Sequence, residues 1–153
     1  MTTLRDMRLE CATATRVLAV AGLFDMHGHI SIRQGDMMFI CDRGASRLTV
    51  RPDLISSVRI SDGKQLSEAL PPSETALHLA AYRAKPEVGS VAHFHPMYAT
   101  AFAVAGKPLE VASNAGAFFG GTIEMHASRF VIEKTWLYAL EKARVAGALA
   151  DLD

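Results

Sequence analysis

An excess of charge of either sign is missing from this sequence. Sixteen lysines and arginines face 16 aspartates and glutamates, and the chain contains no basic run. Nucleic acids and anionic lipids are gathered by a long-range positive field, which a chain of this composition does not generate. The composition therefore favours a small molecule as the partner and predicts neither a nucleic acid nor a membrane surface.

Long apolar runs are also missing. The apolar stretches at residues 17–24 and 98–105 are far shorter than the ~20 residues that a helix needs to cross a bilayer. The first six residues lack the basic and then apolar order of a signal peptide. We therefore expect a cytoplasmic protein.

Cysteine is scarce. Cys11 and Cys41 do not have the spacing of a CxxC motif, and cytosolic chains of this size do not depend on crosslinks, so we expect two buried, reduced thiols. Half of the 153 residues are hydrophobic, which is enough for one proper core. We expect a single domain over residues 1–153.

Hydrophobic periodicity and turn residues predict a chain of mixed α and β structure. We expect helices at residues 3–21, 74–84, 96–105 and from 128 onward. Thr2 or Thr3 caps the first, Ser73 the second and Ser128 the last, and Pro96 occupies the first turn of the third. We expect strands at residues 30–33, 37–41, 54–60, 90–95 and 122–126, with a hairpin turn at 34–36. The mixture of helices and hairpins favours an α+β layered fold over a doubly wound parallel sheet.

His93 and His95 are two residues apart on a predicted strand, so both side chains point to the same face. Such a pair suits a divalent metal, although two hydrogen-bonded surface histidines would give the same pattern. The pair stands at a strand-to-helix junction before Pro96, where functional sites gather. A zinc-like ion with three protein ligands and an open position would polarise a substrate carbonyl or hydroxyl. The pattern therefore requires a third ligand.

Glu74 lies in the first turn of a predicted helix, where a carboxylate favours the helix dipole. Its functional interpretation is an acid/base close to the metal. His78, one turn further along, is interpreted as a structural residue, and so are Tyr82 and Arg83. Helix packing and a solvated face account for these three.

Gly28 precedes a predicted strand, within His27-Gly28-His29. One interpretation of Gly28 is a plain turn glycine, and the other is a glycine of a binding site. A glycine at this point lets backbone amides approach an anion, and His29 and Arg43 could add positive charge.

Three blocks of this sequence resemble the class II aldolase/adducin superfamily. They are GLFDMHGHISIR at residues 22–33, PSETALHLAAYRAKP at 72–86 and VAHFHP at 91–96. Their order, spacing and content agree with the family over residues 4–120. The resemblance implies a three-layer α/β/α fold with a central, mostly antiparallel sheet, and sites near the subunit boundaries of a tetramer. It also implies His93 and His95 as metal ligands and Glu74 as the catalytic acid/base.

The sequence departs from the sugar-phosphate members of this family at the phosphate cradle. Those members usually have Gly-Asn and Ser-Ser-Glu where this chain has Gly28-His29 and Pro72-Ser73-Glu74. His29, with Arg43 on the following loop, suits a carboxylate or a phenolic oxygen, a pattern similar to the hydroxy-aryl acid decarboxylases of the family. This substrate preference is a hypothesis, and Gly28, His29, Arg43 and Ser73 are its expected substrate-binding residues.

A second departure concerns the third metal ligand. The family normally has an apolar strand ending in His-Gly after the Phe-Phe-Gly-Gly region, whereas here residues 122–126 run almost directly into the last predicted helix. Either His126 is the third ligand, or Glu74 completes a set with His93 and His95, or the metal has been lost. Two histidines and a carboxylate are a workable set for a divalent ion.

The leading hypothesis is a metal-dependent lyase that cleaves a carbon–carbon bond of a small hydroxy-carboxylate or hydroxy-carbonyl substrate. Decarboxylation and retro-aldol cleavage share a metal-stabilised enolate, and Glu74 would move the proton. The expected ion is zinc, with manganese, cobalt and iron as alternatives. The rival hypothesis is a non-enzymatic adducin-like assembly module, and a third is a rearranged site with epimerase or cyclase chemistry. We expect a homo-oligomer.

Overall fold

The computed structural model describes residues 3–110 and 122–123. In chain order its elements are α1 (Leu4–Val20), β1 (His29–Gln34), β2 (Met37–Cys41), the 3-10 helix η1 (Pro52–Leu54), β3 (Ile55–Arg59), α2 (Thr75–Ala84), β4 (Ser90–His93), α3 (Met97–Val104), β5 (Leu109–Glu110) and β6 (Thr122–Ile123).

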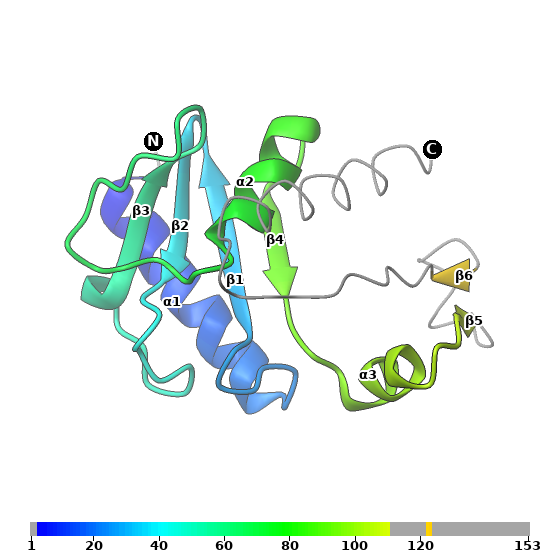
Figure 1. The fold of residues 1–153 in the computed structure, drawn as a ribbon. Helices are drawn as coiled ribbons and strands as arrows, with labels where there is room; N and C mark the ends of the chain where they lie inside the picture. The colour runs from blue at the N-terminus through cyan, green and yellow to red at the C-terminus, as the bar shows by residue number, and fades with distance from the viewer. Residues whose placement is uncertain (1–2, 111–121, 124–153) are drawn as a thin grey trace.

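Four strands form one antiparallel sheet in the order β3-β2-β1-β4. Figure 1 shows α1 against one face of this sheet and α2 against the other. The chain thus has the expected three-layer α/β/α arrangement around an antiparallel sheet. The short strands β5 and β6 pair with each other in a second, two-stranded sheet.

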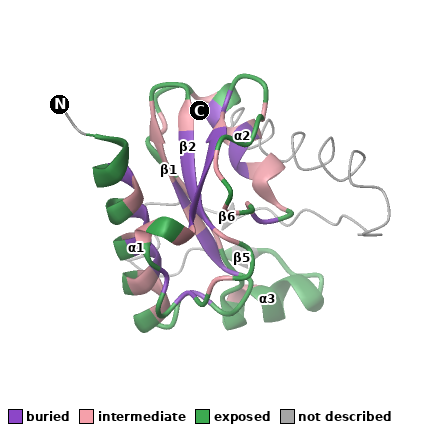
Figure 2. Ribbon diagram, turned by 90° about the vertical axis from the view of Figure 1, so that its left-hand side faces the viewer, coloured by how far each residue is buried: buried purple, intermediate pink, exposed green. Residues whose placement is uncertain are grey.

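The core divides into two clusters because side chains alternate along β2. Phe39 and Cys41 pack toward α1, and their cluster consists of Met7, Cys11, Ala12, Phe39, Cys41, Val50 and Ile55. Met38 and Ile40 pack toward α2, and their cluster consists of Met38, Ile40, Val58, Ile60, Leu79 and Tyr82. In Figure 2 the strand β2 is largely coloured as buried, whereas α3 is exposed.

Helix α1 begins as predicted. Thr3 is its N-cap and forms a capping box, in which its hydroxyl accepts from the Asp6 N–H and the Asp6 carboxylate accepts from the Thr3 N–H. The prediction for the second helix is wrong in one respect. Glu74 takes the N-cap position of α2 instead of Ser73, and no side-chain hydrogen bond caps this end.

The other boundaries are close to prediction. β1 and β2 are joined by a two-residue loop in which Gly35 adopts a φ of +60° that favours glycine. The expected strand at 54–60 is shorter, since η1 uses Leu54 before β3 begins. The strand expected at 90–95 ends at His93, so His95 follows it in a loop. The helix expected from residue 128, and His126, lie outside the described residues.

Both cysteines are buried free thiols, as expected. Burial raises the pKa of Cys11 and of Cys41, so both stay protonated near neutral pH. Within residues 3–110 and 122–123, none of the helices has the length and hydrophobicity to span a membrane.

Candidate active site

Five of the six histidines in the sequence gather at one end of the sheet. Strand pairing starts this cluster, because His29 on β1 is the register partner of His93 on β4. The His93 and His95 rings lie with centroids 4.9 Å apart, the His29 and His78 rings are equally close, and His27 approaches His95 at 6.4 Å.

Glu74 joins this cluster from the start of α2. Its Oε2 lies 3.4 Å from His29 Nε2 and 3.3 Å from His93 Nε2. The carboxyl group is partly buried, with a side-chain exposure of 23%. The structure therefore brings together the carboxylate and one of the two metal-ligand candidates expected from the sequence.

The His93 and His95 side chains converge through their Nε2 atoms, which lie 3.0 Å apart. Two imidazole nitrogens bound to one tetrahedral ion lie about 3.3 Å apart, so small ring movements would let both reach the same ion. Among the described residues, no group of three or more His, Cys, Asp or Glu side chains has the arrangement of a complete metal site. The proposed ligand His126 lies outside the described residues.

Asp25 was not predicted from the sequence as a site residue, yet it holds His95 in place. Its Oδ2 lies 3.2 Å from His95 Nδ1, while its Oδ1 accepts the N–H groups of His27 and Gly28 at 2.8 Å each. Partial burial opposes the charge of Asp25, but these contacts together lower the pKa of its carboxyl group. A carboxylate on the second ring nitrogen fixes the orientation of a metal-binding histidine.

A column of buried hydrogen bonds runs from His29 into the protein. His29 Nδ1 lies 2.8 Å from His78 Nε2, and His78 Nδ1 lies 2.7 Å from the Ser31 hydroxyl. The Ser31 hydroxyl lies 2.8 Å from the Tyr82 hydroxyl, which also lies 3.0 Å from the Ser31 carbonyl oxygen. These four residues are almost fully buried, with exposures of 0–2%.

The environment fixes the protonation of two members of this column. Burial, with smaller effects of His29 and His93 and against the opposing effect of Glu74, lowers the pKa of His78 to about 3, so the ring is neutral at physiological pH. Burial raises the pKa of Tyr82 to about 12, so its hydroxyl keeps its proton. Residue spacing could have revealed the column. Glu74, His78 and Tyr82 recur every four residues along a helix, and Ser31 shares a strand face with His29.

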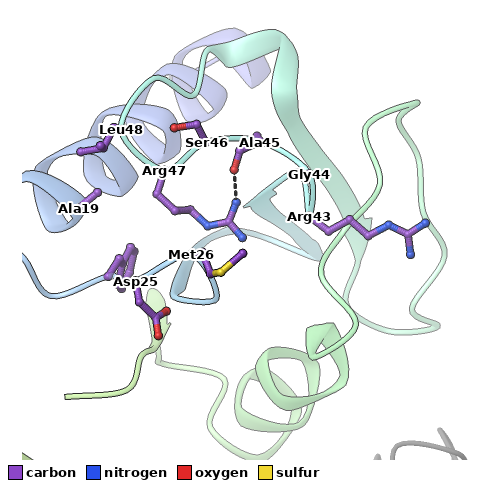
Figure 3. A pocket seen from close by; sticks show the side chains of 10 residues that line it. Ala19, Asp25, Met26, Arg43, Gly44, Ala45, Ser46, Arg47 and Leu48 are labelled. Carbon is purple, nitrogen blue, oxygen red and sulfur yellow. Dashed lines mark hydrogen bonds between the residues drawn. The ribbon is translucent and has the colours of Figure 1, made fainter. Parts of the chain in front are cut away.

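An open pocket of about 640 Å³ has Asp25, the partner of His95, on its wall. Figure 3 shows Arg47 reaching into this region, whereas Arg43 extends away from it. The Arg47 guanidinium is buried and donates to the carbonyl oxygens of Gly28, Asp42 and Ala45. Arg47 thus ties the loop before β1 to the loop after β2.

The four expected substrate-binding residues differ in burial and in their contacts. His29 is buried, and each of its ring nitrogens faces another side chain, His78 or Glu74. The Gly28 N–H donates to Asp25, and its Cα packs so closely on Phe24 that an added Cβ would lie 2.7 Å from that ring. Arg43 and Ser73 are exposed.

The antiparallel sheet between helical layers is the architecture that the resemblance to class II aldolases implied. Comparison with known families gives the same answer, since residues 9–151 match the description "Class II Aldolase and Adducin N-terminal domain". The chain belongs to this family.

Individual relatives are aldolases. The chain is 37% identical over 84 residues to L-fuculose phosphate aldolase of Methanococcus vannielii, a match that covers 55% of this chain and 45% of that protein. It is also 37% identical over 78 residues to 5-methylthioribulose-1-phosphate/5-deoxyribulose-1-phosphate aldolase of Escherichia coli, covering 50% of this chain and 36% of that protein. The chain thus spans less than half the length of these curated relatives.

The solved structure of L-fuculose-1-phosphate aldolase from Thermus thermophilus has the same fold. It superposes with a TM-score of 0.75 at 21% sequence identity, over 95% of this chain and 72% of that one. This likeness confirms the expected fold class.

Proposed function

We propose that this protein is a carbon–carbon lyase that cleaves a small hydroxy-carbonyl compound by a retro-aldol reaction. One observation carries the proposal. The Glu74 carboxyl group lies within 3.4 Å of two imidazole nitrogens and beside the converging His93 and His95 side chains. A carboxyl group placed next to a cation site is the arrangement needed to move a proton where charge develops.

Glu74 is the proposed acid/base. In its carboxylate form it takes the proton from the substrate hydroxyl, the carbon–carbon bond breaks, and the bonding electrons move onto the carbonyl side to give an enolate. The protonated Glu74 then returns that proton to the enolate carbon, so no proton is gained or lost overall. One group in two protonation states is sufficient for this sequence.

His93 and His95 are the proposed ligands of a divalent ion, with zinc as the first expectation and manganese, cobalt and iron as alternatives. The chemistry of the donors fits, because two imidazole side chains converge and a carboxyl group stands beside them. A bound ion would supply Lewis acidity toward a substrate oxygen. The third ligand is His126 or Glu74. Asp25 contacts His95 Nδ1 and would leave Nε2 of that ring available to an ion.

Two observations favour retro-aldol cleavage over decarboxylation. The hypothesis of a hydroxy-acid substrate depends on His29 and Arg43 as its carboxylate-binding residues. His29 is buried with its ring nitrogens facing His78 and Glu74, and Arg43 extends away from the pocket. The relatives named above are also aldolases by their names.

A substrate screen with purified protein tests the proposal. L-fuculose 1-phosphate and 5-methylthioribulose 1-phosphate are incubated with the protein, and release of a three-carbon ketose phosphate is measured. A hydroxy-aryl acid assayed for carbon dioxide tests decarboxylation in parallel. We expect cleavage that falls at least about 100-fold in Glu74→Gln and is unchanged in the control Glu87→Gln, an exposed glutamate after α2. An unchanged rate in Glu74→Gln would refute the proposed role.

We also propose that the chain acts as a single domain over residues 1–153, in the cytoplasm, as a homo-oligomer whose size the family resemblance gives as a tetramer. Exposed apolar side chains on α3, among them Met97, Tyr98 and Val104 with exposures of 72–84%, are consistent with association. Size-exclusion chromatography with light scattering measures the mass. A folded monomer without bound metal and without lyase activity would contradict both the oligomer and the enzyme. A metal-free oligomer would favour the assembly module.

A further inference from the structure

Arg47 is a buried cation whose partners in the described part of the chain are neutral. The residue is 7% exposed, and its Nε donates to the Gly28 carbonyl oxygen at 2.7 Å. Its Nη1 donates to the carbonyl oxygens of Asp42 and Ala45 at 3.1 and 2.5 Å. Within residues 3–110 and 122–123, no carboxylate forms an ion pair with this guanidinium. A buried charge without a counter-charge is costly, so its second terminal nitrogen is of interest.

That nitrogen, Arg47 Nη2, faces the pocket. It has no hydrogen-bond partner among the described residues. Every fully buried side-chain nitrogen or oxygen in this part of the chain has a partner, so Nη2 is not fully buried. Arg47 lines the open pocket of about 640 Å³, and Figure 3 shows its guanidinium reaching into that space. Nη2 therefore presents its N–H groups to the pocket.

The anion-binding groups expected from the sequence do not fill this role. The Gly28 N–H donates to Asp25, and His29 is buried. Arg43 extends away from the pocket in Figure 3. The structure thus offers a donor for an anion at Arg47, a residue that the sequence did not single out.

The remaining wall of the pocket combines an apolar surface with local positive charge. Its apolar side chains are Ala19, Phe24, Met26 and Leu48. Among the described lining residues Asp25 is the only carboxylate, against the two cations Arg43 and Arg47. The chain as a whole has a net charge of zero, so the attraction for an anion is confined to this pocket.

We propose that this pocket binds a small molecule that carries a phosphate or carboxylate group next to an apolar body, with the oxyanion on Arg47 Nη2. The oxyanion supplies the counter-charge that the protein does not, and a hydrogen bond from a guanidinium to an oxyanion is stronger than one between neutral groups. The apolar body lies against Met26 and Leu48. This binding is measured without turnover, so the inference does not depend on the proposed lyase reaction.

Calorimetric titration with phenyl phosphate, inorganic phosphate and phenol is the first test. We expect phenyl phosphate to bind about tenfold or more tightly than either of the others, because it alone has both the oxyanion and the apolar body. Equal affinities of phenol and phenyl phosphate would overturn the role of the anion. Equal affinities of inorganic phosphate and phenyl phosphate would overturn the role of the apolar wall.

Substitutions locate the site. Arg47→Lys keeps the charge but removes the second terminal nitrogen, and it is expected to weaken phenyl phosphate binding about tenfold. Because Arg47 also ties two loops together, Leu48→Glu is the second variant. It puts a carboxylate on the pocket wall at a position that is 59% exposed, and we expect an affinity at least about fivefold lower.

Leu9→Glu is the matched control for Leu48→Glu. Leu9 lies on α1, is 51% exposed and is not among the residues that line the pocket. Its replacement changes the net charge by the same amount and should leave the affinity within about twofold of the parent. Equal affinities of the two variants would overturn the inference.

Two further measurements separate the pocket from the histidine cluster and from turnover. His93→Ala is expected to keep the affinity for phenyl phosphate, and its loss there with retention in Leu48→Glu would place the anion at the histidines and overturn the inference. In the cleavage assay, competitive inhibition by phenyl phosphate would identify the substrate's own phosphate as the occupant, and noncompetitive inhibition a separate anion. Binding that depends on Arg47 in a protein without cleavage activity would contradict the proposed function alone.

Discussion

His29 and His93 are register partners on the antiparallel strands β1 and β4, and their imidazole rings stack with centroids 5.0 Å apart and planes 24° from parallel. Both rings direct Nε2 toward Glu74 Oε2. The core of the site is therefore set by backbone pairing within a sheet and by the start of one helix. Sites built on regular elements hold their geometry more closely than sites on loops.

The first prediction concerns metal content. Protein purified without a histidine tag is expected to hold about one divalent ion per chain, and His93→Ala and His95→Ala are each expected to lose it because their Nε2 atoms converge. Elemental analysis measures the content. The control is His27→Ala, an exposed histidine near His95 that is not part of the proposed ligand set and should keep the metal. Retention of metal in both test variants would place the ion elsewhere.

The second prediction concerns Asp25. Asp25→Asn replaces the carboxylate that accepts from His95 Nδ1 and is expected to weaken metal affinity about tenfold or more. Competition with a chromogenic chelator measures this affinity. Asp62→Asn removes a carboxylate of similar exposure that binds Arg59 in a distant turn, and it should leave the affinity unchanged. Equal affinities of the two variants would show that Asp25 does not support the metal ligand.

The third prediction concerns packing at Gly28. A methyl group there would lie 2.7 Å from Phe24 Cδ1 and 2.9 Å from Phe24 Cβ, so the loop or the ring must move. We expect Gly28→Ala to lower the free energy of unfolding by about 1 to 3 kcal/mol. Gly89→Ala is the matched control, because no atom lies within 4 Å of its added methyl group. Urea unfolding of both variants measures the difference, and equal stabilities would contradict the close approach.

The fourth prediction concerns pH. The pKa of His78 is lowered to about 3 in the folded protein from an ordinary value of 6.5, so the unfolded chain binds a proton that the folded protein does not. The free energy of unfolding therefore falls as the pH is lowered from 6.5 toward 3, by up to about 1.4 kcal/mol per pH unit from this group. His78→Gln should show a shallower decline, measured by urea unfolding between pH 7 and pH 4. Parallel curves for the two proteins would refute the buried, neutral ring.

Much of the fold could be predicted from local patterns. The hairpin at Gly35 and the limits of β2 follow from alternation and turn residues, and Thr3 caps α1 as its sequence indicates. The cap at Ser73 could not be predicted, because whether a serine or the next residue takes the N-cap position depends on how the chain enters the helix. Glu74 occupies that position, and its carboxyl group at the same time contacts His29 of β1 and His93 of β4.

The site was predicted in part. Two-residue spacing identified His93 and His95, and helix position together with the family resemblance identified Glu74. Asp25 was not predicted because its partner His95 is 70 residues away in the sequence. Residue spacing does not show contacts over such a separation. The opposite holds for His78. Its regular spacing from Glu74 and Tyr82 was visible, but only burial and the ring contacts distinguish a hydrogen-bonded column from ordinary helix packing.

The division of the core into two clusters has a consequence for engineering this chain. The cluster under α1, built around Met7, Cys11 and Phe39, shares no residue with the histidine column or with Glu74 on the other face of the sheet. Substitutions that are well separated and share no partners combine additively. The α1 layer can therefore be redesigned for thermal tolerance independently of the chemistry, whereas each substitution in the α2 layer has to be judged for stability and turnover together.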